Sequence, residues 1–340
     1  MLLILPFMNN LVKNITLAFL FLQVVISAQA QVKPLDAGLS TYTYPFPVSF
    51  YQVQAQKQTL KMAFMDVKPA QPNGQTVVLL HGKNFNGAYW KETANALSKN
   101  GYRVIIPDQI GFGKSSKPAQ FQYTFQTLAT QTKHLLDSLG INKVAVLGHS
   151  MGGMLATRFA LMFPEFTQKL ILLNPIGLED WKRWVPYQPI EKWYAGELKQ
   201  NRESIQKYQQ ENYYGGQWKK EYDPWVDVLA GWTEGKDYPL VAWNAALTYD
   251  MIFTQPVVYE FDQLKMPTLL IIGQRDRTAL GKAMASPEAR EKLGNYPVLG
   301  RETAKKIPNA TLVEIENVGH LPHIEAYGRF IPPLLQFLKP

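Results

Sequence analysis

The sequence contains no cysteine among its 340 residues. This absence excludes structural disulfides, cysteine-ligated zinc or iron–sulfur sites, and a thiol nucleophile. A chain of this length, in which 46% of the residues are hydrophobic, can bury a large core without such cross-links. Any catalysis must therefore depend on oxygen or nitrogen groups, and we expect neither a metal ion nor a cofactor.

Clusters of like charge are also missing. The formal net charge is +8, yet the chain has no run of five or six Lys or Arg residues. It lacks zinc-finger spacing and a basic region joined to heptads, which are signatures of nucleic-acid-binding proteins. We therefore expect a small-molecule substrate and no nucleic-acid partner. No pattern in the chain indicates an oligomeric state.

The one long apolar stretch lies near the N-terminus. Lys13 precedes the mainly apolar residues 15–27, and Ala-Gln-Ala at 28–30 then matches the small-x-small pattern of a signal-peptidase site. A membrane span needs about 20 apolar residues, which is more than this stretch has. We interpret residues 1–30 as a signal peptide cleaved near Ala30. The mature chain would then be periplasmic or extracellular, with no stable membrane span; an uncleaved anchor is the alternative.

The rest of the chain alternates between two kinds of pattern. Short apolar runs, typical of strands buried on both faces of a parallel sheet, occur at 76–80, 103–106, 144–147, 170–173, 269–272 and 312–315. Helical periodicity separates most of them, at 90–99, 127–139 and 153–162, and two weakly alternating segments at 48–55 and 60–67 precede them. This order predicts an α/β fold with a mostly parallel central sheet covered by helices on both faces.

One interval interrupts the alternation. Residues 176–255 contain no buried-strand run, but they hold seven of the eight tryptophans. We interpret this interval as a mainly helical lid inserted between two strands, so that residues 31–175 and 256–340 form the core. Its aromatic side chains either anchor a small subdomain or line a substrate pocket, and both roles are compatible. The pattern does not identify individual substrate-binding residues.

The strongest chemical motif is Gly-His-Ser-Met-Gly-Gly at 148–153. It directly follows a predicted strand and precedes a predicted helix, which is the context required for the nucleophile elbow Gly-x-Ser-x-Gly. The sharp turn exposes the serine hydroxyl, while the flanking glycines avoid collisions that Cβ atoms would cause. N–H groups at the start of the helix face the negative charge that develops during attack. The motif predicts that Ser150 is a nucleophile.

A serine hydroxyl needs a base, which is itself oriented by an acid. His320 lies just beyond the last predicted strand, and open α/β sheets place their active sites at this end of the strands. His323 is the alternative base, but the glycine before His320 permits a tighter turn. Asp276 follows the penultimate predicted strand, so its carboxylate can reach His320. We predict a triad of Ser150, Asp276 and His320.

The oxyanion formed during attack requires two N–H donors. One is expected from the backbone of Met151, immediately after the nucleophile, and the other from the loop after the strand at 76–80, at Lys83. Only backbone atoms are needed for this role. The Lys83 side chain either faces solvent or places a cation at the mouth of the pocket.

These motifs resemble those of the α/β-hydrolase superfamily, in its lidded branch of esterases, carbon–carbon bond hydrolases and relatives. The resemblance covers residue 48 to the C-terminus and includes His-Gly at 81–82, the segment 108–115, the elbow, the Asp276 loop and Val-Gly-His at 318–320. Ser150 stands where haloalkane dehalogenases and epoxide hydrolases have an aspartate, which disfavours both activities. The loop 82–87 lacks the Gly-Pro-Gly run common in carbon–carbon bond hydrolases.

The resemblance implies a serine hydrolase that acts on a small or medium carboxylic ester through an acyl-enzyme. Carbon–carbon bond or lactone hydrolysis with the same triad is an alternative. A ligand-binding protein with this fold and little turnover is a third interpretation, from a different functional class. The motifs specify the fold and the triad far better than the substrate.

Overall fold

The computed structural model describes residues 32–339, most of which form one compact unit that begins at Pro34. The predicted signal peptide, residues 1–30, lies outside the described residues. Within residues 32–339 no helix combines the length and the hydrophobicity required to cross a bilayer.

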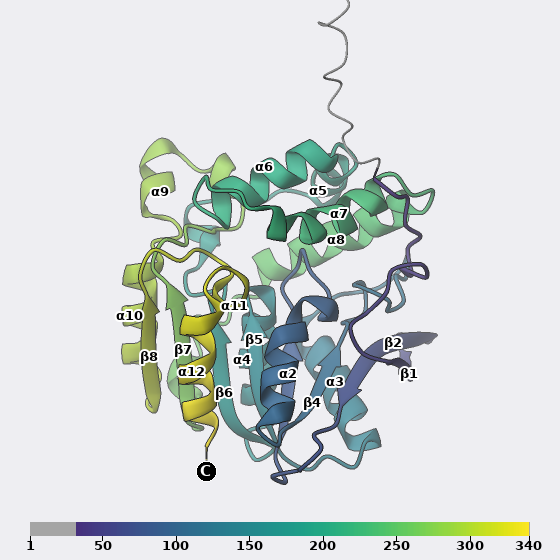
Figure 1. Cartoon of the computed structure of the whole chain (residues 1–340). Coiled ribbons are helices and arrows are strands. Elements are labelled where there is room, and N and C mark those ends of the chain that lie inside the picture. The colour runs from purple at the N-terminus through teal and green to yellow at the C-terminus, as the bar shows by residue number, and fades with distance from the viewer. Residues whose placement is uncertain (1–31, 340) are drawn as a thin grey trace, which may run out of the picture. The chain divides into compact units, whose positions relative to one another are not determined.

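A single sheet of eight strands organises this unit, in the order β1-β2-β4-β3-β5-β6-β7-β8 (Figure 1). The strands are β1 (Val48–Ala55), β2 (Gln58–Val67), β3 (Thr76–Leu80), β4 (Arg103–Pro107), β5 (Val144–His149), β6 (Thr167–Leu173), β7 (Thr268–Gly273) and β8 (Ala310–Ile315). β2 is antiparallel to β1 and β4, whereas all other neighbouring pairs are parallel. The sheet is therefore mixed and mostly parallel, as predicted.

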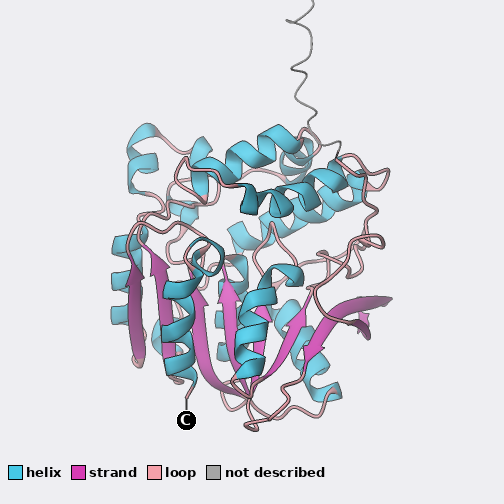
Figure 2. Cartoon of the chain, viewed as in Figure 1, coloured by secondary structure: helices cyan, strands magenta, loops and turns pink. Residues whose placement is uncertain are grey.

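Helices cover both faces of the sheet (Figure 2). The α-helices of the described chain are α2 (Lys91–Lys99), α3 (Phe125–Ser138), α4 (Met151–Met162), α5 (Ile190–Glu197), α6 (Arg202–Asn212), α7 (Asp223–Thr233), α8 (Tyr238–Thr254), α9 (Pro287–Lys292), α10 (Tyr296–Lys306), α11 (Pro322–Glu325) and α12 (Tyr327–Leu338), and those outside α5 to α8 include the ones on the two faces. Short 3₁₀ helices are η1 (Gly87–Trp90), η2 (Trp181–Arg183), η3 (Lys220–Tyr222), η4 (Phe261–Gln263) and η5 (Lys282–Met284).

Alternating side chains of each central strand enter two separate cores. In β3, Val78 and Leu80 pack with α3 and α4, whereas Val77 and Leu79 pack with α2 and α12. This division follows from the geometry of a strand, in which successive side chains point to opposite faces. Because both faces are covered, the central strands are apolar at almost every position, and this explains why their sequences are continuous runs. The α/β fold class is confirmed.

The long connection from β6 to β7 carries α5 to α8, which lie beyond the carboxyl ends of the parallel strands (Figure 1). Their packing is mainly mutual: α5 contacts α8, and α6 contacts α7. Aromatic pairs join these helices, for example the stacked rings of Trp193 and Tyr249, whose centroids are 4.7 Å apart. The segment therefore covers the edge of the sheet at which the predicted catalytic residues lie.

The turn from β5 into α4 brings backbone unusually close to backbone. A Cβ atom placed on Gly152 would lie 2.2 Å from the carbonyl oxygen of Leu80 in β3. One placed on Gly148 would lie 2.0 Å from the carbonyl oxygen of Gly152. Only glycine permits this approach, which seats the first turn of α4 against the end of β3.

We therefore expect Gly152→Ala to lower the free energy of unfolding by about 1–3 kcal/mol, the usual range for overpacking. Gly196→Ala is the matched control, because a Cβ atom there meets nothing within 4 Å on the exposed side of α5. Alanine in that helix should raise stability by about 0.5–1 kcal/mol. Urea denaturation of both variants checks the opposite signs, and equal stabilities would refute the packing argument.

Candidate active site

Ser150 occupies the sharp turn between β5 and α4. Its backbone has φ 57° and ψ −122°, a strained conformation for a residue with a side chain. The carbonyl oxygen of Ser150 accepts hydrogen bonds from Gly153 N at 2.9 Å and from Ile176 N at 3.1 Å, which hold this conformation. The side chain projects at the carboxyl edge of the sheet and is 8% exposed. The geometry is that of a nucleophile elbow.

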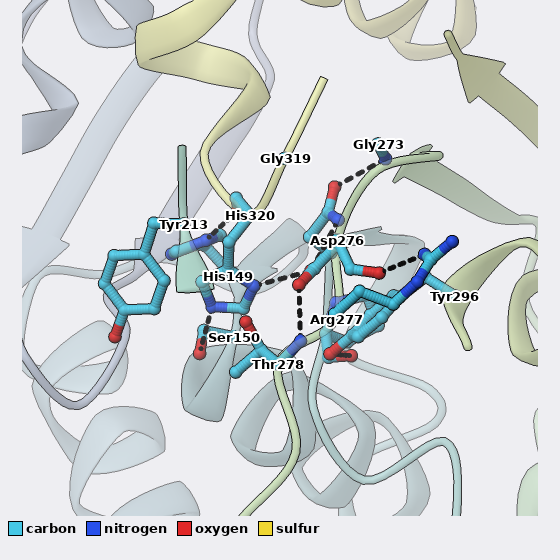
Figure 3. Close-up of polar contacts among 12 residues, drawn as sticks. His149, Ser150, Tyr213, Gly273, Asp276, Arg277, Thr278, Tyr296, Gly319 and His320 are labelled. Atoms are coloured by element: carbon cyan, nitrogen blue, oxygen red, sulfur yellow. Dashed lines mark hydrogen bonds and ion pairs between the residues drawn. The ribbon is translucent and has the colours of Figure 1, made fainter. Parts of the chain in front are cut away.

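His320 and Asp276 complete a continuous line of contacts with Ser150 (Figure 3). His320 Nε2 lies 2.9 Å from Ser150 Oγ, and His320 Nδ1 lies 2.6 Å from Asp276 Oδ2. Because a carboxylate can only accept, Nδ1 carries the proton and Nε2 is free to accept the serine hydroxyl proton. His320 and Asp276 are fully buried. The structure thus brings the three predicted residues together in the order that base catalysis requires.

The carboxylate of Asp276 is held from two sides. Its Oδ1 accepts a hydrogen bond from Thr278 N, and its Oδ2 accepts one from Asn174 Nδ2, both at 2.8 Å. Asn174 also accepts a hydrogen bond from Gly273 N at 2.9 Å, at the end of β7. This buried amide therefore ties the loop after β6 to the acid after β7.

A chain of three hydrogen bonds connects the loop after β3, called the oxyanion loop because it contains Lys83, to His320. Gly82 N donates to Tyr89 Oη at 2.9 Å, Tyr89 Oη contacts His149 Nδ1 at 3.1 Å, and His149 Nε2 contacts the His320 carbonyl oxygen at 2.8 Å. A carbonyl oxygen only accepts, so the His149 proton sits on Nε2, and Tyr89 donates to Nδ1. Burial, with help from His320 and His323, holds the pKa of His149 well below its usual value. The neutral ring thus supports the His320 main chain.

His323, the alternative base, does not reach Ser150. Its ring stacks on Trp90 with centroids 4.6 Å apart, and neither ring nitrogen has a hydrogen-bond partner among the described residues. His134 lies on the exposed surface of α3. His320 is therefore the histidine that the structure places beside the serine.

The two predicted oxyanion donors belong to segments that adjoin Ser150. Met151 N is the first N–H of α4, and Lys83 N belongs to the loop after β3. This loop approaches the elbow so closely that a Cβ atom on Gly82 would lie 3.0 Å from Ser150 Cβ. Within residues 32–339 neither N–H has a hydrogen-bond acceptor, which leaves both available to an oxyanion.

The Lys83 side chain points inward rather than to solvent. Its Nζ lies 3.3 Å from Glu197 Oε1 at the end of α5 and 3.6 Å from the ring centroid of Tyr249. Burial lowers the pKa of Lys83, and the charge of Glu197 opposes that shift. Of the two orientations that the sequence allowed, the structure therefore has the Lys83 side chain directed toward the pocket rather than toward solvent. Its charge is already paired with Glu197.

A cavity of ≈ 210 Å³ begins at this lysine and extends under α5 to α8. Its walls include Lys83 and Asn84 of the oxyanion loop, Phe112, and residues of all four helices. Neither Ser150 nor His320 is part of these walls, which consist of described residues only. The cavity therefore adjoins the loop that follows β3, which also approaches Ser150, without including the serine itself. No group of three or more potential metal ligands occurs in the described part of the chain.

Asn174 and Tyr213 are among the contributors to the site that were not anticipated from the sequence. Asn174 directly follows β6, so the rule that places polar residues at the carboxyl ends of strands could have found it. Tyr213 carries no such signal, since it lies beyond α6 in the segment between β6 and β7. Its carbonyl oxygen accepts from His320 N at 3.1 Å, and its ring stacks on the imidazole with centroids 4.8 Å apart.

A family model for the α/β hydrolase fold matches residues 75–327. The chain belongs to this family. A probable hydrolytic enzyme from Pseudomonas aeruginosa PAO1, known from its crystal structure, is 51% identical to the chain with a TM-score of 0.90. That comparison covers 92% of this α/β hydrolase and 100% of the other chain.

Curated relatives match less completely. Lipase 1 of Psychrobacter immobilis is 27% identical over 263 residues, which is 74% of this chain and 73% of the lipase. The 2-hydroxy-6-oxo-6-phenylhexa-2,4-dienoate hydrolase of Burkholderia cepacia is 39% identical over 108 residues. That match covers 31% of this α/β hydrolase and 38% of the Burkholderia enzyme, well under half of its length.

The buried His323 predicts a pH dependence of stability. Burial, followed by repulsion from His320, lowers the pKa of His323 to about 3 from 6.5. Between these values the unfolded chain binds a proton that the folded α/β hydrolase does not, so the free energy of unfolding falls as pH drops. The loss is up to ~1.4 kcal/mol per pH unit.

His323→Phe removes this titration while retaining an aromatic ring against Trp90. We expect the variant to lose less stability than the wild type between pH 6.5 and pH 4.5 in urea denaturation. His134→Phe, a change at an exposed histidine of α3, should keep the wild-type slope. Equal slopes in all three proteins would contradict the assignment.

Proposed function

We propose that this α/β hydrolase cleaves a carboxylic ester through an acyl-enzyme formed on Ser150. The observation that carries the proposal is the line of contacts from Ser150 Oγ to His320 Nε2, at 2.9 Å, and from His320 Nδ1 to Asp276, at 2.6 Å. These contacts give the serine a base in the correct tautomer before any substrate binds. The matched esterase-type relatives, such as Lipase 1 of Psychrobacter immobilis, support the same class of reaction.

The reaction follows from the roles of these groups. Ser150 Oγ attacks the ester carbonyl carbon while its proton passes to His320 Nε2, and the Met151 and Lys83 amides hold the oxyanion. The C–O bond to the leaving alcohol then breaks as His320 returns the proton to that oxygen. Water, deprotonated by His320, attacks the acyl-enzyme, and the carboxylic acid leaves as the proton returns to Ser150.

Asp276 remains ionised throughout this cycle. Its negative charge stabilises the imidazolium that forms when His320 takes the serine proton. The donors Asn174 and Thr278 keep the carboxylate aimed at His320 Nδ1. The acid therefore acts by orientation and charge rather than by accepting the proton.

A second candidate is hydrolysis of a carbon–carbon bond or a lactone with the same triad. The identity of 39% to the Burkholderia cepacia hydrolase favours it, although that match spans 38% of the relative. The absence of a Gly-Pro-Gly run at 82–87 favours the ester reaction. Ester hydrolysis is therefore the first candidate.

Two proposals concern the chain outside the triad. We propose that residues 176–255 act as a lid, since their helices cover the carboxyl edge of the sheet and border the cavity.

We also propose that residues 1–30 direct export and are removed near Ala30. N-terminal sequencing of protein recovered from periplasmic and culture fractions would test the second proposal.

The nucleophile is tested by hydrolysis of p-nitrophenyl esters of graded acyl length. We expect Ser150→Ala to lower kcat by at least about 10³-fold, because the triad acts as a unit. Ser138→Ala, at an exposed serine of α3, should keep wild-type activity. A fluorophosphonate should label the wild type at Ser150 only. If the wild type shows no ester turnover and no labelling of Ser150, the hydrolase proposal is overturned in favour of a ligand-binding protein.

The acid is tested by Asp276→Asn. The amide cannot stabilise an imidazolium and favours the wrong tautomer of His320, so we expect kcat to fall by about 10⁴-fold. Asp262→Asn, at an exposed aspartate of η4, provides the matched control. Wild-type turnover by a folded Asp276→Asn protein would exclude this carboxylate from the mechanism.

A further inference from the structure

The cavity under α5 to α8 has two chemically different walls. The wall formed by α5 and α6 is mainly polar and includes Glu197, Ser204 and Gln209 beside Ile205. The wall formed by α7 and α8 is more apolar: it includes Leu229 and Val241, together with the hydroxyl-bearing Thr233, Tyr238 and Tyr249. A plain hydrocarbon would satisfy only one of these walls, because buried polar groups need partners.

The charge of Glu197 on the polar wall is cancelled by Lys83 from the loop after β3. Lys83 Nζ and Glu197 Oε1 are 3.3 Å apart, and their side chains are 10% and 19% exposed. A carboxylate entering the cavity would bring an unpaired negative charge close to Glu197. Removing such a group from water without a counter-charge is costly. The pair therefore disfavours anionic ligands even though it contains a lysine.

Gln209 adds an unsatisfied amide to the same wall. The residue is fully buried, and neither its Oε1 nor its Nε2 has a hydrogen-bond partner among residues 32–339. It lies one helical turn after Ile205, which is also buried and also lines the cavity. Its buried face is thus the face that α6 presents to the cavity. A glutamine amide offers one acceptor and one donor group, which is the complement of another amide.

We infer that the acyl group hydrolysed at Ser150 carries a neutral amide, which binds the polar wall of this cavity. The inference rests on the proposed ester hydrolysis and specifies its substrate class. Lys83 connects the two regions, because the preceding Gly82 closely approaches Ser150 and the Lys83 side chain lines the cavity. An acyl chain with its carbonyl at Ser150 extends past Lys83, with its amide on Gln209 and its methylene groups on α7 and α8.

Three isosteric p-nitrophenyl esters test this inference, with acyl chains that end in a carboxamide, a carboxylate or an isopropyl group. In the wild type, kcat/KM for the carboxamide should exceed that for each of the others by at least about tenfold, because unpaired polar groups penalise the analogues. Ratios of kcat/KM within one protein cancel differences in the amount of folded enzyme. The readout is therefore insensitive to partial unfolding.

Two substitutions address the polar wall separately. Gln209→Met keeps the length of the side chain and removes the amide, so the ratio of carboxamide to isopropyl ester should fall at least about fivefold. Glu197→Gln leaves Lys83 unpaired, so the ratio of carboxylate to carboxamide ester should rise. Glu203→Gln, the same change at an exposed position of α6, should leave both ratios at wild-type values.

The outcomes separate the inference from the proposed function. A preference of the wild type for the isopropyl or carboxylate ester, or equal turnover of all three, would overturn the neutral-amide assignment while ester hydrolysis at Ser150 stands. Unchanged ratios in both Gln209→Met and Glu197→Gln would also overturn it. Failure of the wild type to cleave any ester would overturn the proposed function, and the substrate assignment with it.

Discussion

The strained backbone of Ser150 is the constraint on which the rest of the site depends. Its φ of 57° is tolerated because α4 lies almost against the end of β3, where Gly148 and Gly152 remove the side chains that would prevent contact. This arrangement directs the hydroxyl toward His320 and leaves the first N–H of α4 free. The predicted nucleophile and one predicted oxyanion donor are thus products of a single turn.

The remaining parts of the site come from segments that are far apart in the sequence. Asp276 and His320 follow β7 and β8, while the His320 main chain is supported by His149 from the elbow and by Tyr213 from the segment between β6 and β7. The connection that follows α6 therefore also contributes to holding His320. The segment that borders the cavity and the segment that holds the His320 main chain are therefore continuous, because Tyr213 directly follows α6.

The elements that could be predicted are those governed by local rules. Buried parallel strands are continuous apolar runs, and residues that follow their carboxyl ends meet at one edge, so Ser150, Asp276 and His320 could be proposed together. The direction of the Lys83 side chain depends on Glu197, more than 100 residues away, in a helix whose packing has no readable code. The cavity walls escaped prediction for the same reason, because α5 to α8 contact mainly one another.

The order of the strands distributes the site unevenly across the sheet. Ser150 follows β5, which is flanked by strands on both sides, whereas His320 follows β8, an edge strand whose side chains are mostly only half buried or exposed. Fraying at that edge would separate the base from the nucleophile while the centre of the sheet keeps its hydrogen bonds. Hydrolytic activity therefore depends on the sheet edge formed by β8 staying folded. It can be lost by local unfolding of β8 while most of the molecule is still folded.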